Sequence, residues 1–336
     1  MKRILLIGTG GTIACSTSKN GLSPHYNIEE LLNYVPEVRK LCDISGQLIM
    51  NIDSTNINPD HWIHIAETIY KNYNDYDGFV VTHGTDTMAY TSCALSYILQ
   101  NLGKPIVLTG AQHSIESIGT DAKQNLSDAV IFAIEDVAGV FVAFDGKIIS
   151  GTRSKKVKTK SLDAFSSVNF PYIAYVKHGV VTYNEDILKF LQPSTNKEPQ
   201  FDFSLCTSII ILKLFPGINP KIFDFIKKEY KGVIIESFGI GGIPFKDYDI
   251  ISKIKELTEN GIAVIVTTQC QEEGIDLDIY EVGKKLAKTK IIYAQDMNIE
   301  AITAKLMWAI GKSQNLDEIK KLIETPIMND LVLRIQ

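Results

Sequence analysis

The sequence predicts an α/β protein of two domains, each built around a twisted sheet whose strands are mostly parallel. Short aliphatic runs bounded by glycine or polar turns recur along the chain, which is typical of parallel strands buried on both faces. Segments with the length of helices separate these runs, and repeated strand–helix alternation indicates helices that flank a sheet. The chain has 336 residues, more than a single core usually supports, and this predicts two domains.

The N-terminal part contains the larger set of expected elements. We expect strands over residues 4–7, 78–81, 105–108 and 139–144, each a continuous apolar run. We expect helices between them over residues 60–72, 88–100 and 121–134. These elements together predict a large sheet with flanking helices.

The C-terminal part repeats the alternation on a smaller scale. We expect strands over residues 207–212, 233–235 and 263–266, and helices over residues 249–260 and 299–310. Just before them the stretch "LQPSTNKEPQFDFS" has two prolines, polar residues and no periodicity, as linkers do. We therefore predict a catalytic domain over 1–190, a linker over 191–204 and a smaller α/β domain with a parallel sheet over 205–336.

Composition excludes several classes of function. The formal net charge is -5, and although "RSKKVKTK" is locally basic, nothing else supplies a cationic stripe for a phosphate backbone, so nucleic acid is a poor candidate for a partner. No apolar run reaches the ~18 residues of a membrane helix, and the four aliphatics after Lys2-Arg3 fall short of the ~7–15 that a secretion signal needs. The five scattered cysteines argue against a disulfide framework. We expect a cytoplasmic protein with no membrane partner.

Neither a metal nor a cofactor is expected. The six histidines have no ligand spacing, and no pair of cysteines has the spacing of a zinc site. The glycine-rich turn after the first strand, "GTGGTI", has Ile13 where a dinucleotide fingerprint needs its third glycine, and it lacks the lysine of a phosphate-binding loop. A nicotinamide-binding module is thus disfavoured. The glycines instead let backbone N–H groups approach a ligand beside a threonine whose hydroxyl could attack it.

A second stretch, "VVTHGTDTMAY", also joins a strand end to a helix start. Thr85 or Asp86 could cap the helix that follows, an interpretation as good as catalysis for this stretch taken alone. We expect His83 to be a structural hydrogen-bonding residue, because no carboxylate lies at a telling spacing from it.

Two further stretches carry polar groups. "GTRSKK" could be a solvated basic loop, or it could bring a lysine into a closed pocket where the lysine accepts a proton from a hydroxyl. "NIDSTN" places small polar groups at an expected strand end, where loop capping is the alternative to ligand binding.

Together these stretches resemble the bacterial-type L-asparaginases, and most of all their cytoplasmic, type I branch. The resemblance covers essentially the whole chain. The matching motifs are "TGGTIA" (9–14), "DST" (53–55), "HGTDTMAYT" (83–91), "TGAQ" (109–112), "RSKK…DAF" (153–165), "IESFGIGG" (235–242) and "TTQC" (267–270).

The resemblance implies the two-domain asparaginase-like fold and an amidohydrolase that converts L-asparagine to L-aspartate and ammonia. It implies that Thr12 is the nucleophile and that Thr85, Asp86 and Lys156 form a second catalytic set. The residues that it assigns to substrate binding are Gly11, Asp53, Ser54, Thr55, Gly84 and Ala111. It also implies a homodimer or homotetramer with no cofactor.

The base that activates Thr12 is left open. Many relatives have a tyrosine ten residues after the nucleophile, where this sequence has Leu22. Tyr26, four residues later, is a candidate for the base or for part of a lid over the substrate. Direct attack by a water held by Thr85 and Lys156 is the alternative mechanism.

Three other functions compete with this prediction. A mixed asparaginase/glutaminase is one, because a single methylene changes binding by only about 1–3 kcal/mol. The asparaginase-like subunit of an amidotransferase that acts on glutamyl-tRNA is another, although that subunit normally has an extra domain before the catalytic core, whereas the first strand here starts at Ile4. A non-catalytic amino-acid sensor is the third, disfavoured because Thr12, Thr85, Asp86 and Lys156 are all retained.

Overall fold

A computed structural model describes residues 1–18, 21–24, 27–190, 198–276 and 289–331. The chain divides into two compact units, Met1–Phe203 and Ser204–Gln336. Part of the expected linker, residues 191–197, lies outside the described residues. Among the described helices, none is long and apolar enough to cross a membrane.

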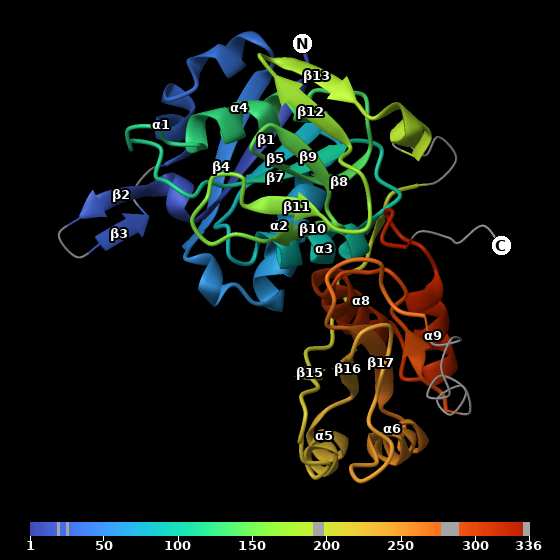
Figure 1. Cartoon of the computed structure of the whole chain (residues 1–336). Helices are drawn as coiled ribbons and strands as arrows, with labels where there is room; N and C mark the ends of the chain where they lie inside the picture. Colours follow the sequence, from blue (N-terminus) through green and yellow to red (C-terminus); the bar gives the residue numbers. More distant parts are fainter. Residues whose placement is uncertain (19–20, 25–26, 191–197, 277–288, 332–336) are drawn as a thin grey trace. The chain divides into compact units, whose positions relative to one another are not determined.

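The first unit is built on an eight-stranded sheet of order β13-β12-β9-β8-β7-β5-β1-β4 (Figure 1). The strands β4, β1, β5, β7 and β8 pair in parallel, whereas β9, β12 and β13 continue the sheet antiparallel. The bounds are β1 (Arg3–Gly10), β4 (Asp43–Ile52), β5 (Gly78–Thr82), β7 (Pro105–Thr109), β8 (Gly139–Phe144), β9 (Lys147–Ser150), β12 (Ala174–Lys177) and β13 (Val180–Tyr183).

Helices cover both faces of this sheet because alternate residues of each strand point to opposite sides. Ile4, Leu6, Val80 and Val107 pack in one core with α1 and α4, and α2 and α3 lie on the other face (Figure 1). The bounds are α1 (Ile28–Asn33), α2 (Pro59–Asn72), α3 (Met88–Ile98) and α4 (Ala122–Ala133).

Small strands complete the unit. They form the pairs β2 (Cys15–Ser18) with β3 (Gly21–Pro24), β6 (Leu99–Gln100) with β14 (Gln200–Phe201), and β10 (Ser154–Lys156) with β11 (Phe165–Ser167). The expected helix over 88–100 therefore ends two residues early, because its last two residues pair with β14 instead.

The second unit has a four-stranded sheet of order β15-β16-β17-β18, all parallel. Its strands are β15 (Ile209–Lys213), β16 (Gly232–Ser237), β17 (Ala263–Thr268) and β18 (Ile292–Tyr293). Its helices are α5 (Ile222–Glu229), α6 (Ile250–Glu259), α8 (Ile299–Lys312) and α9 (Leu316–Glu324). The prediction of two α/β units with mostly parallel sheets is confirmed.

A fully buried ion pair fastens the second unit near its C-terminal end. Lys305 on α8 lies 2.6 Å from Asp330, and both side chains are completely inaccessible. The lysine also donates to the carbonyl of Thr325 at 2.8 Å, and the Asp330 carboxylate accepts the N–H of Ile327 at 2.8 Å. The pair thus ties the segment after α9 to α8.

Removal of one member of this pair is expected to destabilise the second unit strongly. Asp330→Ala removes the carboxylate that faces a completely buried ammonium, and breaking a buried ion pair in this way costs about 3–5 kcal/mol. The double variant Lys305→Met/Asp330→Ala should recover part of that loss, because it removes the buried ammonium as well. Urea unfolding of the three proteins measures the effect, and a double variant less stable than Asp330→Ala would contradict the expectation.

Candidate active site

The loops that follow β1 and β5 touch each other at a glycine in each loop. Gly11 has a φ of +83°, a conformation that L side chains rarely adopt, and a Cβ placed on it would lie 2.4 Å from the backbone nitrogen of Gly84. The N–H of Gly11 donates to the carbonyl of Ile52 at the end of β4, at 3.2 Å. Only a residue without a side chain fits between these strand ends, so the glycines bring three loops together.

Thr12 follows this contact and begins a short 3₁₀ turn, Thr12–Ala14. Ile13 and Ala14 are buried in the core, whereas Thr12 is half-buried. The apolar pair thus anchors the turn in the core and leaves Thr12 partly accessible, directly after Gly11 in sequence.

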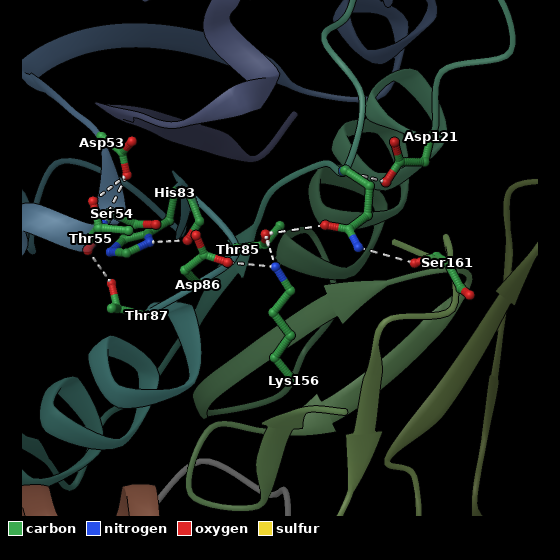
Figure 2. Close-up of polar contacts among 12 residues, drawn as sticks. Asp53, Ser54, Thr55, His83, Thr85, Asp86, Thr87, Asp121, Lys156 and Ser161 are labelled. Carbon is green, nitrogen blue, oxygen red and sulfur yellow. Dashed lines mark hydrogen bonds and ion pairs between the residues drawn. The ribbon is translucent and has the colours of Figure 1, made fainter. Parts of the chain in front are cut away.

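The "DST" stretch forms a turn next to the same cluster (Figure 2). The carboxylate of Asp53 accepts hydrogen bonds from the N–H and the hydroxyl of Thr55, both at 2.9 Å, so it caps the turn. Ser54 is buried, its carbonyl accepts the hydroxyl of Thr87 at 2.8 Å, and a Cβ on Gly84 would lie 2.5 Å from its Oγ. Asp53 therefore caps the turn, as one interpretation expected, and the same turn also lies against the Gly84 loop.

Lys156 joins the two polar side chains that follow Gly84. Its Nζ donates to Thr85 Oγ1 and to Asp86 Oδ1, both at 2.7 Å (Figure 2). Thr85 is buried and the lysine side chain is 16% exposed, whereas that of Asp86 is 57% exposed. The interpretation of this lysine as part of a solvated basic loop is wrong.

Helix capping does not explain Thr85 and Asp86 either. The N-cap residue of α3 is Thr87, and its side chain makes no capping hydrogen bond. Its hydroxyl bonds instead to the carbonyl of Ser54, and so links the start of α3 to the "DST" turn. Thr85 and Asp86 lie before the cap and are left to contact Lys156.

Helix α3 also supports the strand that carries Lys156. The hydroxyl of Ser92, one turn into the helix, donates to the carbonyl of Gly151 at 2.7 Å and lies 3.0 Å from Ser154 Oγ. Ser154 begins β10, which ends at Lys156 and pairs with β11. The start of α3 therefore fixes the loop that carries Thr85, and the second turn of α3 fixes the strand that carries Lys156.

His83 is completely buried behind this loop. Its Nδ1 lies 2.7 Å from the carbonyl of Gly84, an acceptor, so Nδ1 carries the proton and Nε2 accepts the hydroxyl of Thr91 at 2.9 Å. The same hydroxyl accepts the indole N–H of Trp62 at 3.0 Å. Burial lowers the pKa of His83 to about 4. The prediction of a structural hydrogen-bonding histidine is confirmed.

One residue at the site was not singled out by the sequence. Gln112 Oε1 accepts the hydroxyl of Thr85 at 3.3 Å, and its Nε2 donates to the carbonyl of Ser161 at 3.1 Å (Figure 2). Gln112 ends the "TGAQ" motif and follows the buried Ala111. Its only sequence signal was membership of that motif, because the contact with Thr85 spans 27 residues.

The structure thus gathers most of the predicted site residues in adjoining loops. Tyr26, the candidate for base or lid, lies outside the described residues, and the side chain of Leu22 is likewise not described. The residues brought together are Gly11, Thr12, Asp53, Ser54, Thr55, Gly84, Thr85, Asp86 and Lys156, with Ala111 in the loop next to Thr85. Within the described residues no group of three or more His, Cys, Asp or Glu is arranged to hold a metal ion.

Comparison with known proteins gives matches along nearly the whole chain. Residues 3–189 match the family model "Asparaginase, N-terminal", and residues 208–323 match "Glutaminase/Asparaginase C-terminal domain". An L-asparaginase of Thermococcus kodakarensis is 38% identical over 98% of this chain and 99% of its own length.

Two further similarities extend this finding. A glutamyl-tRNA(Gln) amidotransferase subunit of Pyrococcus abyssi is 38% identical over 97% of this chain and 76% of its own length. The crystal structure of L-asparaginase I from Vibrio cholerae superposes with a TM-score of 0.89 and 28% identity over 99% of both chains.

The buried histidine makes stability depend on pH. Between pH 6.5 and about 4 the unfolded chain binds a proton at His83 that the folded protein does not, so the free energy of unfolding falls as the pH is lowered through this range. The full effect is about 3 kcal/mol, from about 1.4 kcal/mol for each unit by which the pKa is lowered.

His83→Asn isolates this contribution, because its amide N–H can still donate to the carbonyl of Gly84 but does not titrate. Urea unfolding at pH 7.5 and pH 4.5 should show a larger loss for the wild type than for the variant. An equal loss in both proteins would mean that His83 does not carry the effect.

Proposed function

The chain belongs to the asparaginase family, and we propose that it hydrolyses the side-chain amide of L-asparagine to L-aspartate and ammonia, with Thr12 as the nucleophile. One observation carries the proposal. Two threonines lie on loops whose backbones touch at Gly11 and Gly84, and the second of them is hydrogen-bonded to a lysine. Two hydroxyls beside an amine are the groups that stepwise amide hydrolysis needs.

In the first step, Thr12 Oγ1 attacks the carboxamide carbon and a tetrahedral intermediate forms, while a neighbouring base takes the hydroxyl proton of Thr12 and later passes it to the leaving nitrogen. Backbone N–H groups of the adjoining Gly11 and Gly84 loops are suited to hold the negative oxygen, a form of stabilisation worth roughly 3–4 kcal/mol per donor. The C–N bond then breaks, the nitrogen takes up a proton, and ammonia leaves an aspartyl ester on Thr12.

In the second step, a water adds to the ester carbon. In this step Lys156 acts as the free amine: it takes the proton of this water through the Thr85 hydroxyl, whose Oγ1 lies 2.7 Å from Nζ, and the proton then passes to the Thr12 oxygen. The C–Oγ1 bond breaks, Thr12 regains its proton, and aspartate leaves.

Carboxylates and small hydroxyls near the loops account for recognition of the amino acid. Asp86 is exposed on one side, so its carboxylate can bind the substrate α-ammonium by a charge-assisted hydrogen bond while it contacts Lys156 on the other. Asp53, Ser54 and Thr55 bind the α-ammonium and the α-carboxylate from the neighbouring turn. Ala111 presents its carbonyl to the amide nitrogen.

We also propose a cytoplasmic location. Cys42, Cys93, Cys206 and Cys270 are all free thiols in the described part of the chain, as is usual in a reducing compartment. Assembly as a homodimer or homotetramer stays a prediction, which sedimentation of the purified protein would test.

A role as part of an amidotransferase is the second candidate, favoured by the 38% identity to the amidotransferase subunit of Pyrococcus abyssi. The two candidates differ in what the isolated chain does. Full turnover of free asparagine supports the asparaginase proposal, whereas turnover that rises many-fold only when glutamyl-tRNA and a partner protein are added supports the second candidate.

Ammonia release from L-asparagine tests the proposal. Thr12→Ala removes the nucleophile and Lys156→Met removes the proton relay, so each should lower kcat by at least about 10³-fold while the protein stays folded. Thr12→Ser keeps a hydroxyl and Lys155→Met changes the neighbour on the opposite face of β10, so both should retain most of the activity. Thr12→Ala with unchanged turnover would refute the nucleophile.

The same assay measures substrate preference. L-Glutamine is longer by one methylene, which changes transition-state binding by about 1–3 kcal/mol, so we expect kcat/KM for glutamine to be lower by roughly 10- to 100-fold. Equal values for both amides would establish a mixed asparaginase/glutaminase instead. Binding of asparagine without release of ammonia would support a sensor.

A further inference from the structure

Asp121 occupies the N-cap position of α4 but does not cap it. Its side chain makes no hydrogen bond to the first turn, and the hydroxyl of Thr120 accepts the N–H of Ala122 instead, at 3.0 Å. The Asp121 carboxylate turns toward the loop after β7 (Figure 2). Its Oδ2 accepts the N–H of Gln112 at 2.9 Å, and its Oδ1 accepts the N–H of His113 at 3.0 Å. A residue type that normally caps a helix is thus used to hold a loop.

The contact between Asp121 and this loop is buried, and Asn125 makes a second contact with the same loop. Asp121 is 8% exposed, and the positive end of α4 favours the charge that it carries there. Asn125, one turn along α4, donates from Nδ2 both to Asp121 Oδ2 at 3.2 Å and to the carbonyl of Gly110 at 3.0 Å. Two side chains of one helix therefore fix the backbone on both sides of Ala111.

The geometry of the peptide unit decides where the carbonyl of Ala111 points. The Ala111–Gln112 bond is trans, and in a trans peptide the C=O and the following N–H point in opposite directions. Because Asp121 holds the N–H of Gln112, the Ala111 carbonyl points away from Asp121. Gly110, the residue before Ala111, packs against the loop that carries Thr85. A Cβ placed on Gly110 would lie 2.3 Å from the carbonyl oxygen of His83 and 3.5 Å from Thr85 Cγ2.

We propose that Asp121 is a positioning residue that aims the Ala111 carbonyl at the nitrogen of the substrate carboxamide. The inference rests on the proposed function and deepens it. The carbonyl accepts an N–H of the amide when substrate binds, and this hydrogen bond strengthens as the C–N bond breaks and the nitrogen takes up a proton. A charged acceptor on the N–H side also polarises the peptide unit, which makes its carbonyl a better acceptor.

Asp121→Asn tests the proposal with a side chain of the same shape. The two backbone N–H groups bond to different oxygens of Asp121, and in asparagine one of these positions is an NH2 donor, so one N–H loses its acceptor and the peptide unit loses its fixed orientation. We expect kcat/KM for L-asparagine to fall by about 10- to 100-fold, as for other single hydrogen bonds that strengthen in the transition state. Circular dichroism and thermal unfolding confirm that the variant is folded.

Asp128→Asn is the matched control. Asp128 lies on the same helix, is 1% exposed and accepts the side chain of Gln124 at 2.7 Å, but it has no hydrogen bond to the loop that carries Ala111. Burial raises the pKa of Asp128 to about 6, so at pH 8 the control also removes a buried negative charge. Its kcat/KM should stay within about threefold of the wild type.

An ester substrate separates positioning from general damage to the site. The β-methyl ester of L-aspartate is cleaved at the same carbon, but its leaving oxygen has no N–H for the Ala111 carbonyl to accept. We therefore expect Asp121→Asn to lower kcat/KM for the ester by less than about threefold while the amide reaction falls by at least about tenfold.

Three outcomes would overturn the inference: equal losses on amide and ester, unchanged activity on both, or the same loss in Asp128→Asn as in Asp121→Asn. Failure of the wild type to release ammonia from asparagine is a different result. It would refute the proposed function itself, and this inference with it.

Discussion

The site depends on the contact between the backbones of Gly11 and Gly84. A side chain on Gly11 would collide with the nitrogen of Gly84, and one on Gly10, which has a φ of +103°, would lie 2.5 Å from the nitrogen of Ile52. The loops that follow β1 and β5, which carry Thr12 and Thr85, therefore touch although they are far apart in sequence. The position is the one where open α/β sheets place ligands, beyond the carboxyl ends of adjacent parallel strands.

Two helices convert this contact into a rigid arrangement. Helix α3 begins at Met88, two residues after Asp86, and its second turn holds the strand that carries Lys156. Helix α4 holds the loop that carries Ala111 and Gln112, through Asp121 and Asn125. Each helix fixes groups from a distant part of the sequence, so the site is built from backbone that is already ordered by the sheet.

The sequence predicted the features that depend on neighbouring residues. Buried parallel strands such as β5 and β7 were recognised because an apolar run bounded by turns has few other interpretations, and the glycine turn before Thr12 directed attention to a ligand. Contacts set by tertiary structure were missed. The carboxylate of Asp121 serves a loop eight residues away rather than its own helix, and β12 and β13 are exposed on alternate residues and lack a continuous apolar run.

The identity of the attacking group is the central claim, and trapping of the intermediate tests it most directly. The wild-type protein is mixed with excess L-asparagine, quenched in acid within milliseconds, digested, and its peptides are weighed by mass spectrometry. The account predicts an added aspartyl group on the peptide that contains Thr12, absent from an unmixed sample. An aspartyl group on the peptide that contains Thr85, with none on Thr12, would contradict it.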